Sequence, residues 1–180
     1  MRTFWNTTNG LETIEEWKPN CWVQVTNPSK EDTEYLVSEL GIPDYFLDDI
    51  ADTDERPRYE FDEGWVLIIL RIPYVKEVRS RTPYITVPLG IIMKKEVCIT
   101  VCNFESNMMI DFVNYHRKRG QGFTDSVDMV FRIFLSSAVW YLKRLKQINM
   151  LIEKSKGNLD HTIDNAELIR LSKLQDSLTY

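Results

Sequence analysis

The sequence predicts a fold of the α/β (α+β) class, in which helices cover a mixed β-sheet and long antiparallel helices follow it. Two observations support this prediction. Up to about residue 120, strand-like apolar runs are mixed with helix-like segments, whereas residues 125–156 contain neither glycine nor proline. With 180 residues, 43% of them hydrophobic, the chain is long enough for one domain with its own core. We expect that domain in residues 1–122 and a helical extension in residues 123–180.

The first predicted strand is followed directly by a helix. Residues 21–27, CWVQVTN, alternate in polarity up to Pro28, which is typical of a strand closed by a turn. Ser29 is expected to cap the next helix, which has acidic residues in its first turn and ends at Gly41. The buried side of this helix is expected to comprise Leu36, Val37 and Leu40.

A second short helix is predicted over residues 43–52, PDYFLDDIAD. Pro43 lies at a position typical of helix starts, where the missing N–H of proline leaves no hydrogen bond unmade. The apolar side of this helix consists of Tyr45, Phe46, Leu47 and Ile50. Its outer side is acidic.

Strands are then predicted from residue 58 onward. Tyr59 and Phe61 alternate with charged residues, and residues 63–72, EGWVLIILRI, form the apolar run expected of a central strand covered on both faces. Residues 82–93 and 96–102 follow as two strands of a hairpin. Because Pro88 cannot donate a ladder hydrogen bond, its strand is expected to lie at an edge or to bulge there.

The second part of the chain is predicted to be helical. Residues 104–120 end at Gly120, and one helix of roughly 45 Å is expected over residues 125–156 at 1.5 Å per residue. Its apolar stripe consists of Val127, Phe131, Phe134, Ala138, Tyr141, Leu145, Ile148 and Ile152. After a break at residues 156–160, KGNLD, a second helical stripe is expected at Leu168, Leu171, Leu174 and Leu178. No helix-ending residue precedes Tyr180, so the sequence stops inside a predicted helix.

Composition excludes several classes of function. The 22 Lys and Arg against 27 Asp and Glu give a net charge of −5, which argues against binding to a nucleic-acid backbone. The N-terminus has no apolar signal segment and no run approaches the roughly 20 apolar residues of a membrane helix, so we expect a soluble chain.

Cys98 and Cys102 lie too far apart on one strand to be bridged, which leaves a bridge to Cys21 as the alternative to three free thiols.

Nothing in the sequence resembles a complete catalytic motif. Residues 120–125, GQGFTD, hold two of the glycines of a dinucleotide fingerprint but follow a helix, which favours a helix-ending glycine and a flexible turn. His116 and His161 are isolated in polar surroundings, with no partner at metal-ligand spacing. The basic run at residues 116–120 is interpreted as a solvated helix end rather than a phosphate site. We therefore expect a protein that is not an enzyme.

The acidic segment is the strongest chemical signal. Thirteen of the 27 acidic residues lie in residues 31–63, with Arg56 and Arg58 as the only bases there. Hard cations such as Mg²⁺ prefer carboxylate oxygens, often through retained waters. The candidate ligands in this segment are Asp48, Asp49 and Asp52. The alternative interpretation is a solvated helix face.

The order of these parts resembles the cytoplasmic domain of the CorA family of magnesium and cobalt transporters. In that family an acidic L-E-D-I segment leads into R-P-K-x-E, an I-I-L strand and a strand ending in I-T-V. Here the matching parts are Leu47–Ile50, the structural signature Arg56, Pro57 and Glu60, the strand at residues 63–72, and EVCITVCN at residues 96–103. The long helix from Asp125 is similar to the family's helix between the sheet and the membrane stalk.

The resemblance implies a homo-oligomer, a pentamer in the full-length family, at the cytoplasmic face of the cell membrane. It implies Mg²⁺, and also Co²⁺, as ions that bridge subunits and favour the closed pore. It further implies that Arg56-Pro57 is a structural joint, with Arg56 neutralising a carboxylate such as Asp49. Some members hold a regulatory ion with an aspartate after the central strand; Val75 stands there in this sequence, with Glu77 as the nearby acidic candidate.

Two alternatives remain beside this interpretation. Within the superfamily, the zinc-transporting branch is the second candidate. Outside it, the chain is a stand-alone cytosolic scaffold that oligomerises through its long helix. Two apolar stretches of about 20 residues beyond Tyr180 in the native gene would distinguish a transporter from a scaffold.

Overall fold

The computed structural model describes residues 1–76, 83–159, 168–169, 172–173 and 175–176. Within these residues lies a seven-stranded mixed sheet in the order β2-β1-β3-β7-β6-β5-β4, with β3 and β7 as its parallel pair. The strands are β1 (Arg2–Asn6), β2 (Glu12–Ile14), β3 (Trp22–Thr26), β4 (Arg58–Asp62), β5 (Trp65–Val75), β6 (Tyr84–Lys94) and β7 (Val97–Cys102). The helices are α1 (Lys30–Ser38), α2 (Asp44–Ala51), α3 (Asn107–Arg119) and α4 (Ser126–Leu159).

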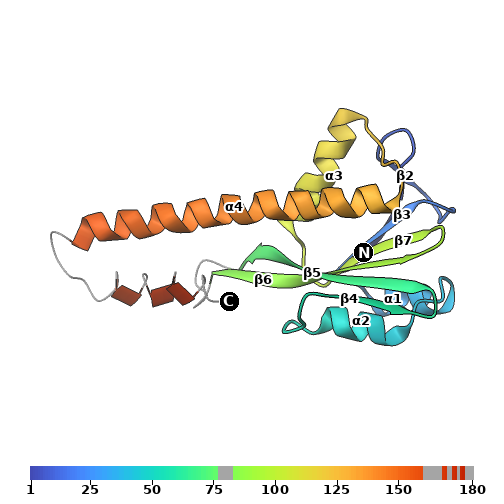
Figure 1. Cartoon of the computed structure of the whole chain (residues 1–180), viewed down its shortest axis with the longest axis horizontal. Coiled ribbons are helices and arrows are strands. Elements are labelled where there is room, and N and C mark those ends of the chain that lie inside the picture. Colours follow the sequence, from blue (N-terminus) through green and yellow to red (C-terminus); the bar gives the residue numbers. More distant parts are fainter. Residues whose placement is uncertain (77–82, 160–167, 170–171, 174, 177–180) are drawn as a thin grey trace.

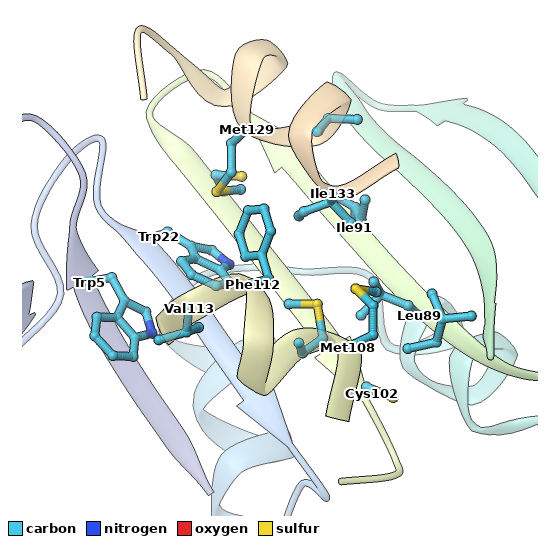
Figure 2. Close-up of a cluster of buried hydrophobic side chains, with 14 of the residues drawn as sticks. Trp5, Trp22, Leu89, Ile91, Cys102, Met108, Phe112, Val113, Met129 and Ile133 are labelled. Atoms are coloured by element: carbon cyan, nitrogen blue, oxygen red, sulfur yellow. The ribbon is translucent and has the colours of Figure 1, made fainter. Parts of the chain in front are cut away.

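The predicted fold class is confirmed, because helices cover both faces of the mixed sheet (Figure 1). α1 and α2 lie on one face, where Leu36, Phe46 and Ile50 join one buried cluster. α3 and the first half of α4 lie on the other, where Phe112 and Ile133 belong to a second cluster (Figure 2). The sheet is thus the middle of three layers.

Local sequence signals place the helix ends as predicted. The Ser29 hydroxyl accepts a hydrogen bond from the Asp32 N–H at 3.2 Å, and the Asp32 carboxylate accepts one from the Ser29 N–H at 3.1 Å. This reciprocal cap satisfies two N–H groups that the first turn of α1 leaves unpaired. At the other end of the domain, Gly120 ends α3 with a φ of +61°, a conformation that glycine adopts without a steric penalty.

The predicted strands from residue 58 onward are all present, although β5 is second from the edge of the sheet rather than central. Trp65, Leu67 and Ile69 face the α1–α2 layer, and the alternate residues face the α4 layer. Pro88 matches its prediction, because β6 pairs with β7 only from Gly90 to Lys94 and has β5 alone beside it at Pro88.

The N-terminal strands β1 and β2 were missed by the sequence analysis. Both are short, and β2 has a single residue that is not fully exposed, so their hydrophobic periodicity is weak. β1 is held by its pairing with β3 and by Trp5, which stacks against Trp22 with ring centres 6.1 Å apart. Pairing with β3 and the Trp5–Trp22 contact therefore stabilise a strand that the local sequence does not predict.

The long helix is confirmed, but its buried side differs from the predicted apolar stripe and shares only Ile148 with it. Among the α4 residues whose burial is described, the buried ones are Met129, Val130, Ile133, Ser137, Trp140 and Ile148. On a helix of 3.6 residues per turn this set is rotated by roughly a quarter-turn from the predicted stripe. Of that stripe, Val127 and Phe131 are exposed, at 53% and 65%. The helix is apolar around much of its circumference, and periodicity alone did not select the side that meets the sheet.

The predicted break at residues 156–160 is also corrected. α4 continues through Gly157 to Leu159. A glycine inside a helix costs only about 1 kcal/mol relative to alanine, which a helix of 34 residues tolerates. Of the second predicted stripe, Leu168 is exposed, and the other three leucines lie outside the described residues.

His116 is buried, contrary to the polar surroundings expected from its neighbours in the sequence. Only 4% of the residue is exposed, and its ring packs against Phe112 and Phe123 with ring centres 4.7 and 4.9 Å away. Its Nδ1 has no hydrogen-bond partner in the described part of the chain. Burial, with Arg132 nearby, lowers the pKa of this imidazole. His161 lies outside the described residues.

The three cysteines are free thiols, which decides against the alternative of a bridge to Cys21. All three are buried, and Cys21 lies near Cys98 beside the β3–β7 pair. Burial raises the pKa of Cys98 to about 12 and that of Cys102 to about 11. Thiols in this state are poorly reactive, because the thiolate is the reactive form.

Candidate functional site

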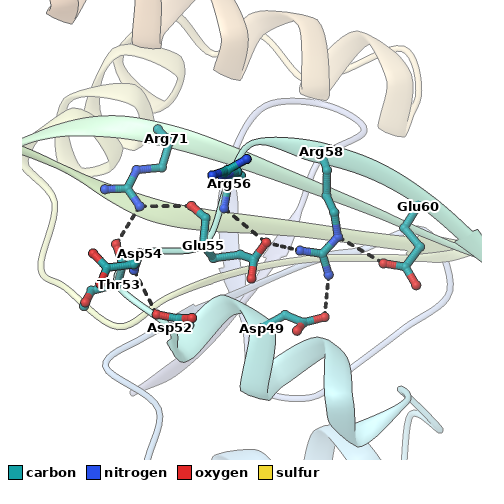
Figure 3. Close-up of polar contacts among 9 residues, drawn as sticks. All are labelled: Asp49, Asp52, Thr53, Asp54, Glu55, Arg56, Arg58, Glu60 and Arg71. Carbon is teal, nitrogen blue, oxygen red and sulfur yellow. Dashed lines mark hydrogen bonds and ion pairs between the residues drawn. The ribbon is translucent and has the colours of Figure 1, made fainter. Parts of the chain in front are cut away.

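The acidic segment is organised around Arg58 on β4 (Figure 3). Its Nη2 donates to the Asp49 carboxylate on α2 at 2.5 Å, and its Nε donates to Glu60 at 3.1 Å. Nη1 contacts the carboxylate of Glu55. Burial lowers the pKa of Arg58, but the hydrogen bonds to Glu60 and Asp49 outweigh that effect and raise it. One guanidinium thus contacts three carboxylates from α2, β4 and the loop between them and offsets part of their negative charge.

Arg71 on β5 fixes the same loop from its other side (Figure 3). Its Nη1 donates to the carbonyl oxygens of Thr53 at 2.6 Å and Glu55 at 3.0 Å. Its Nε and Nη2 donate to the hydroxyl and carbonyl oxygens of Thr86 on β6, at 3.0 and 2.6 Å. The two arginines therefore hold the connection from α2 to β4 against the sheet.

The role predicted for Arg56 belongs to Arg58. The side chain of Arg56 is exposed and forms no ion pair with any residue that the structure describes, whereas its backbone N–H donates to Glu55 at 3.1 Å. Pro57 is exposed just before β4, and Glu60 forms an ion pair with Arg58. The difference follows from position: Arg58 lies on β4, where its guanidinium reaches Asp49, whereas Arg56 lies before the strand begins.

A tyrosine adds a further contact at the start of α2. The Tyr45 hydroxyl donates to the Asp62 carboxylate at 2.5 Å. This hydrogen bond raises the pKa of Tyr45 to about 12. It joins the N-terminal end of α2 to the end of β4, so the acidic segment is held at both ends of the short helix.

The candidate metal ligands do not converge in the described part of the chain. Asp49 is paired with Arg58, while Asp48 is exposed and Asp52 accepts a hydrogen bond from the Asp54 N–H at 2.9 Å. Among the residues that the structure describes, no three His, Cys, Asp or Glu side chains gather as a metal-binding group. Glu77 lies outside the described residues. An inner-sphere cage needs several converging oxygens, which these three aspartates do not provide.

The sequence analysis missed Arg71 and gave the wrong partner to Asp49. The sequence did contain an indication of this role, because a charged residue inside the apolar run of a covered strand requires polar partners. The backbone carbonyl oxygens of Thr53 and Glu55, in the loop after α2, are those partners.

Comparisons with known proteins identify the family. A sequence model described as "CorA-like Mg2+ transporter protein" matches residues 17–180. The chain belongs to the CorA family. This match covers every element except β1 and β2, including the arginine-centred acidic segment. Among curated proteins, none matches the sequence.

Solved structures agree with the CorA assignment at the level of the fold. The complete CorA magnesium transporter of Methanocaldococcus jannaschii has a TM-score of 0.86 at 20% identity, over 100% of this chain and 57% of that one. The soluble domain of the same transporter has a TM-score of 0.83 at 19% identity, and the match covers 100% of this chain and 72% of that domain. The ZntB cytoplasmic domain of Vibrio parahaemolyticus has a TM-score of 0.73 at 16% identity, and the match covers 98% of this chain and 71% of that domain.

The chain therefore spans 57% of the length of the complete CorA structure that it matches. Among the described residues, none of the helices combines the length and the apolar character that a membrane crossing requires.

Proposed function

We propose that this chain is the cytoplasmic, cation-sensing domain of a CorA-like transporter of magnesium or another divalent cation. The observation that carries the proposal is the family match over residues 17–180, supported by agreement of the fold along the whole chain. In this proposal residues 1–122 form the sensing domain and residues 123–180 lead toward the membrane. The chain's role is regulatory rather than enzymatic.

The acidic surface of α2 is the proposed sensing region. Asp48 and Asp52 are exposed, and Asp52 accepts a hydrogen bond from the Asp54 N–H through Oδ1, so a hydrated Mg²⁺ or Co²⁺ can approach both side chains from solvent. Asp49 serves a different purpose, because Arg58 already neutralises it. Glu77, which follows β5, is a further candidate ligand.

Gating follows from assembly. In the proposed homo-oligomer, a pentamer in the full-length family, cations between subunits stabilise the closed arrangement. A ligand that binds only the assembled interface shifts the population toward the closed arrangement. Loss of the ligand shifts the population back toward the open one. The ion sensed and the ion carried are the same, so uptake limits itself.

Zinc is the second candidate ion, favoured by the structural match to the ZntB cytoplasmic domain. Structural zinc sites are built from cysteine and histidine ligands, and carboxylates join histidine or cysteine in catalytic ones, whereas this surface offers carboxylates without either partner. The three cysteines and His116 are buried away from it. The ligand chemistry therefore supports magnesium over zinc.

Cation uptake by proteoliposomes that hold the full-length protein tests the proposed function. We expect Mg²⁺ entry that falls as Mg²⁺ inside the vesicles rises. The variant Asp48→Asn/Asp52→Asn is expected to need a higher internal concentration for the same inhibition. Faster uptake of Zn²⁺ than Mg²⁺ would favour the second candidate, and absence of any divalent uptake would exclude both.

A further inference from the structure

The parallel strands β3 and β7 end at the same edge of the sheet, and the chain leaves them toward opposite faces. Thr26 pairs with Cys102 at that edge, and the N–H of Asn27 donates to the Cys102 carbonyl oxygen at 2.8 Å. After β3 the chain enters α1 on one face, and after β7 it enters α3 on the other (Figure 1). In open α/β sheets, ligands bind in the crevice that such a divergence creates at the carboxyl ends of the strands.

A cavity of about 550 Å³ lies at this divergence, on the α3 side of the sheet. We call it the strand-end cavity; its volume is within the range of about 300–1,000 Å³ that is typical of small-molecule sites. The rings of Tyr74 and Phe104 lie side by side in its lining, with 5.2 Å between their centres. The other large apolar side chains of the lining include Trp5, Met109 and Val113 (Figure 2).

The Gln24 side chain on β3 contributes an amide to the cavity lining. Its Oε1 accepts a hydrogen bond from the Trp5 indole N–H at 3.0 Å. This contact distinguishes the two ends of the amide, and no residue in the described part of the chain accepts a hydrogen bond from Nε2. The amide therefore keeps two N–H donors and one oxygen lone pair for a ligand.

Ser106 adds a buried hydroxyl that lacks a partner. Only 3% of the residue is exposed, it lines the cavity, and its Oγ makes no hydrogen bond to any residue that the structure describes. Ser106 occupies the N-cap position of α3, but its side chain does not cap the helix. A buried hydroxyl without a partner costs free energy, and a polar ligand atom beside it would remove that cost.

The charges around the cavity favour an uncharged ligand. Among the described residues that line it, Glu105 has the one charged side chain, and this residue is exposed. The N-terminal amine of Met1 also lies at the cavity, but it is 3.1 Å from the Asp32 carboxylate. An anionic ligand would therefore enter without a free cation to pair with it. Aromatic walls with neutral amide and hydroxyl groups suit a planar ring that has a polar edge.

We propose that the strand-end cavity binds an uncharged adenine derivative, with the ring against the aromatic lining and the polar edge on the Gln24 amide. Adenine presents the acceptor N7 beside a donor amino group, and a glutamine amide pairs with both at once. The Ser106 hydroxyl is the second polar contact. This site goes beyond the proposed cation sensing and involves no divalent ion.

Titration of this chain with adenosine in the presence of a chelator tests the proposal. The NMR signal of the Trp5 indole N–H is the reporter, because this group donates to Gln24. We expect saturable shifts of this signal and of the backbone N–H signals of residues 103–106, with a dissociation constant below about 1 mM. Purine riboside, which lacks the amino group, is expected to bind about fivefold more weakly. AMP, which adds a phosphate, is also expected to bind more weakly than adenosine.

Two variants of the cavity are compared with a matched control. Gln24→Glu keeps an oxygen acceptor for the Trp5 indole but replaces the amide donor with a carboxylate, so adenosine binding is expected to weaken by about tenfold or more. Ser106→Ala is expected to weaken it about fivefold, and it carries the test if Gln24→Glu unfolds. Gln121→Glu adds the same charge at an exposed position outside the cavity and should bind like the parent. Circular dichroism confirms that each variant is folded.

The absence of saturable shifts up to about 1 mM adenosine would overturn the proposal. Parent-like binding by both cavity variants would also overturn it, because the ligand would then lie elsewhere. Equal affinity for purine riboside would contradict the contact with the Gln24 amide, and tighter binding of AMP than of adenosine would contradict an uncharged ligand. Because the chelator removes divalent ions, none of these results bears on the proposed cation sensing.

Discussion

Arg58 on β4 and Asp49 on α2 form the ion pair that joins the acidic helix to the sheet, with 2.5 Å between Nη2 and Oδ2. The same guanidinium reaches Glu55 and Glu60, so four charged groups share one site. This arrangement explains why a dense acidic segment lies directly beside an apolar strand. The carboxylates on the inner side share the single positive charge of Arg58, and those on the outer side remain exposed to solvent.

Arg58→Ala is expected to lower the free energy of unfolding by about 1–2 kcal/mol, because three carboxylates then repel one another without a cation. The pairs are about one-third exposed, and screening by water keeps the effect in this range. Urea denaturation at low salt measures it.

Arg56→Ala is the control for this prediction. Its exposed side chain should contribute no more than about 0.5 kcal/mol. Equal losses in the two variants would mean that the ion-pair network does not stabilise the joint between α2 and β4.

Gly122→Ala is expected to destabilise the turn between α3 and α4. A Cβ at this position would lie 2.0 Å from the Thr7 carbonyl oxygen and 2.6 Å from that of Thr8, which are backbone atoms. The loop after β1 would have to move, and the hydrogen bond from the Phe123 N–H to Thr7 would be strained. We expect a loss of about 1–3 kcal/mol by thermal or urea unfolding. Gln121→Ala, at an exposed neighbouring position, should cost much less; similar values would contradict the close approach.

His116 makes stability depend on pH. Burial lowers its pKa in the folded chain, so the unfolded chain binds the proton more readily. Stability is therefore lost as pH falls through the unfolded value of about 6.5. Arg132 and Arg119 add to this effect and Asp128 opposes it.

The variant His116→Phe is expected to lose less stability than the parent between about pH 7.5 and about pH 5.5. His161 is present in both proteins, so the difference between their pH profiles reports residue 116 alone. Parallel profiles would show that the imidazole does not titrate differently in the folded chain.

The cysteines should react only when the chain opens. Burial raises the pKa of Cys98 and Cys102 to about 12 and about 11, so their thiolate fractions near neutral pH are small. We expect three equivalents of thiol in denaturant without reductant, and far slower labelling of the native chain. Rapid native labelling, or fewer than three thiols, would contradict the free and buried state of these residues.

Much of the fold follows from the sequence because strong local signals agree with the tertiary structure. Ser29 caps α1, Gly120 ends α3, and the apolar run of β5 lies between two layers of helices. Where local signals are weak, as in β1 and β2, pairing with β3 decides the structure.

The errors have two physical causes. α4 carries apolar residues around much of its surface, so its buried side is fixed only by the sheet and α3. In the acidic segment, the spacing in the sequence does not show which arginine faces α2. Arg58 lies on β4 and reaches Asp49, whereas Arg56 lies before the strand and is exposed to solvent. The candidate cation ligands remain a prediction that only binding data test.

The most direct test of cation sensing is the thermal unfolding of this chain in millimolar Mg²⁺ and in sodium salt of the same ionic strength. A ligand that binds only the native state adds about 1.4 kcal/mol of stability at a concentration ten times its dissociation constant. Screening of the carboxylates acts equally in both salts. We expect a higher melting temperature in Mg²⁺, reduced by Asp48→Asn/Asp52→Asn but not by the control Glu15→Gln/Glu16→Gln, which removes the same charge elsewhere. Equal melting temperatures in the two salts would contradict cation sensing by this surface.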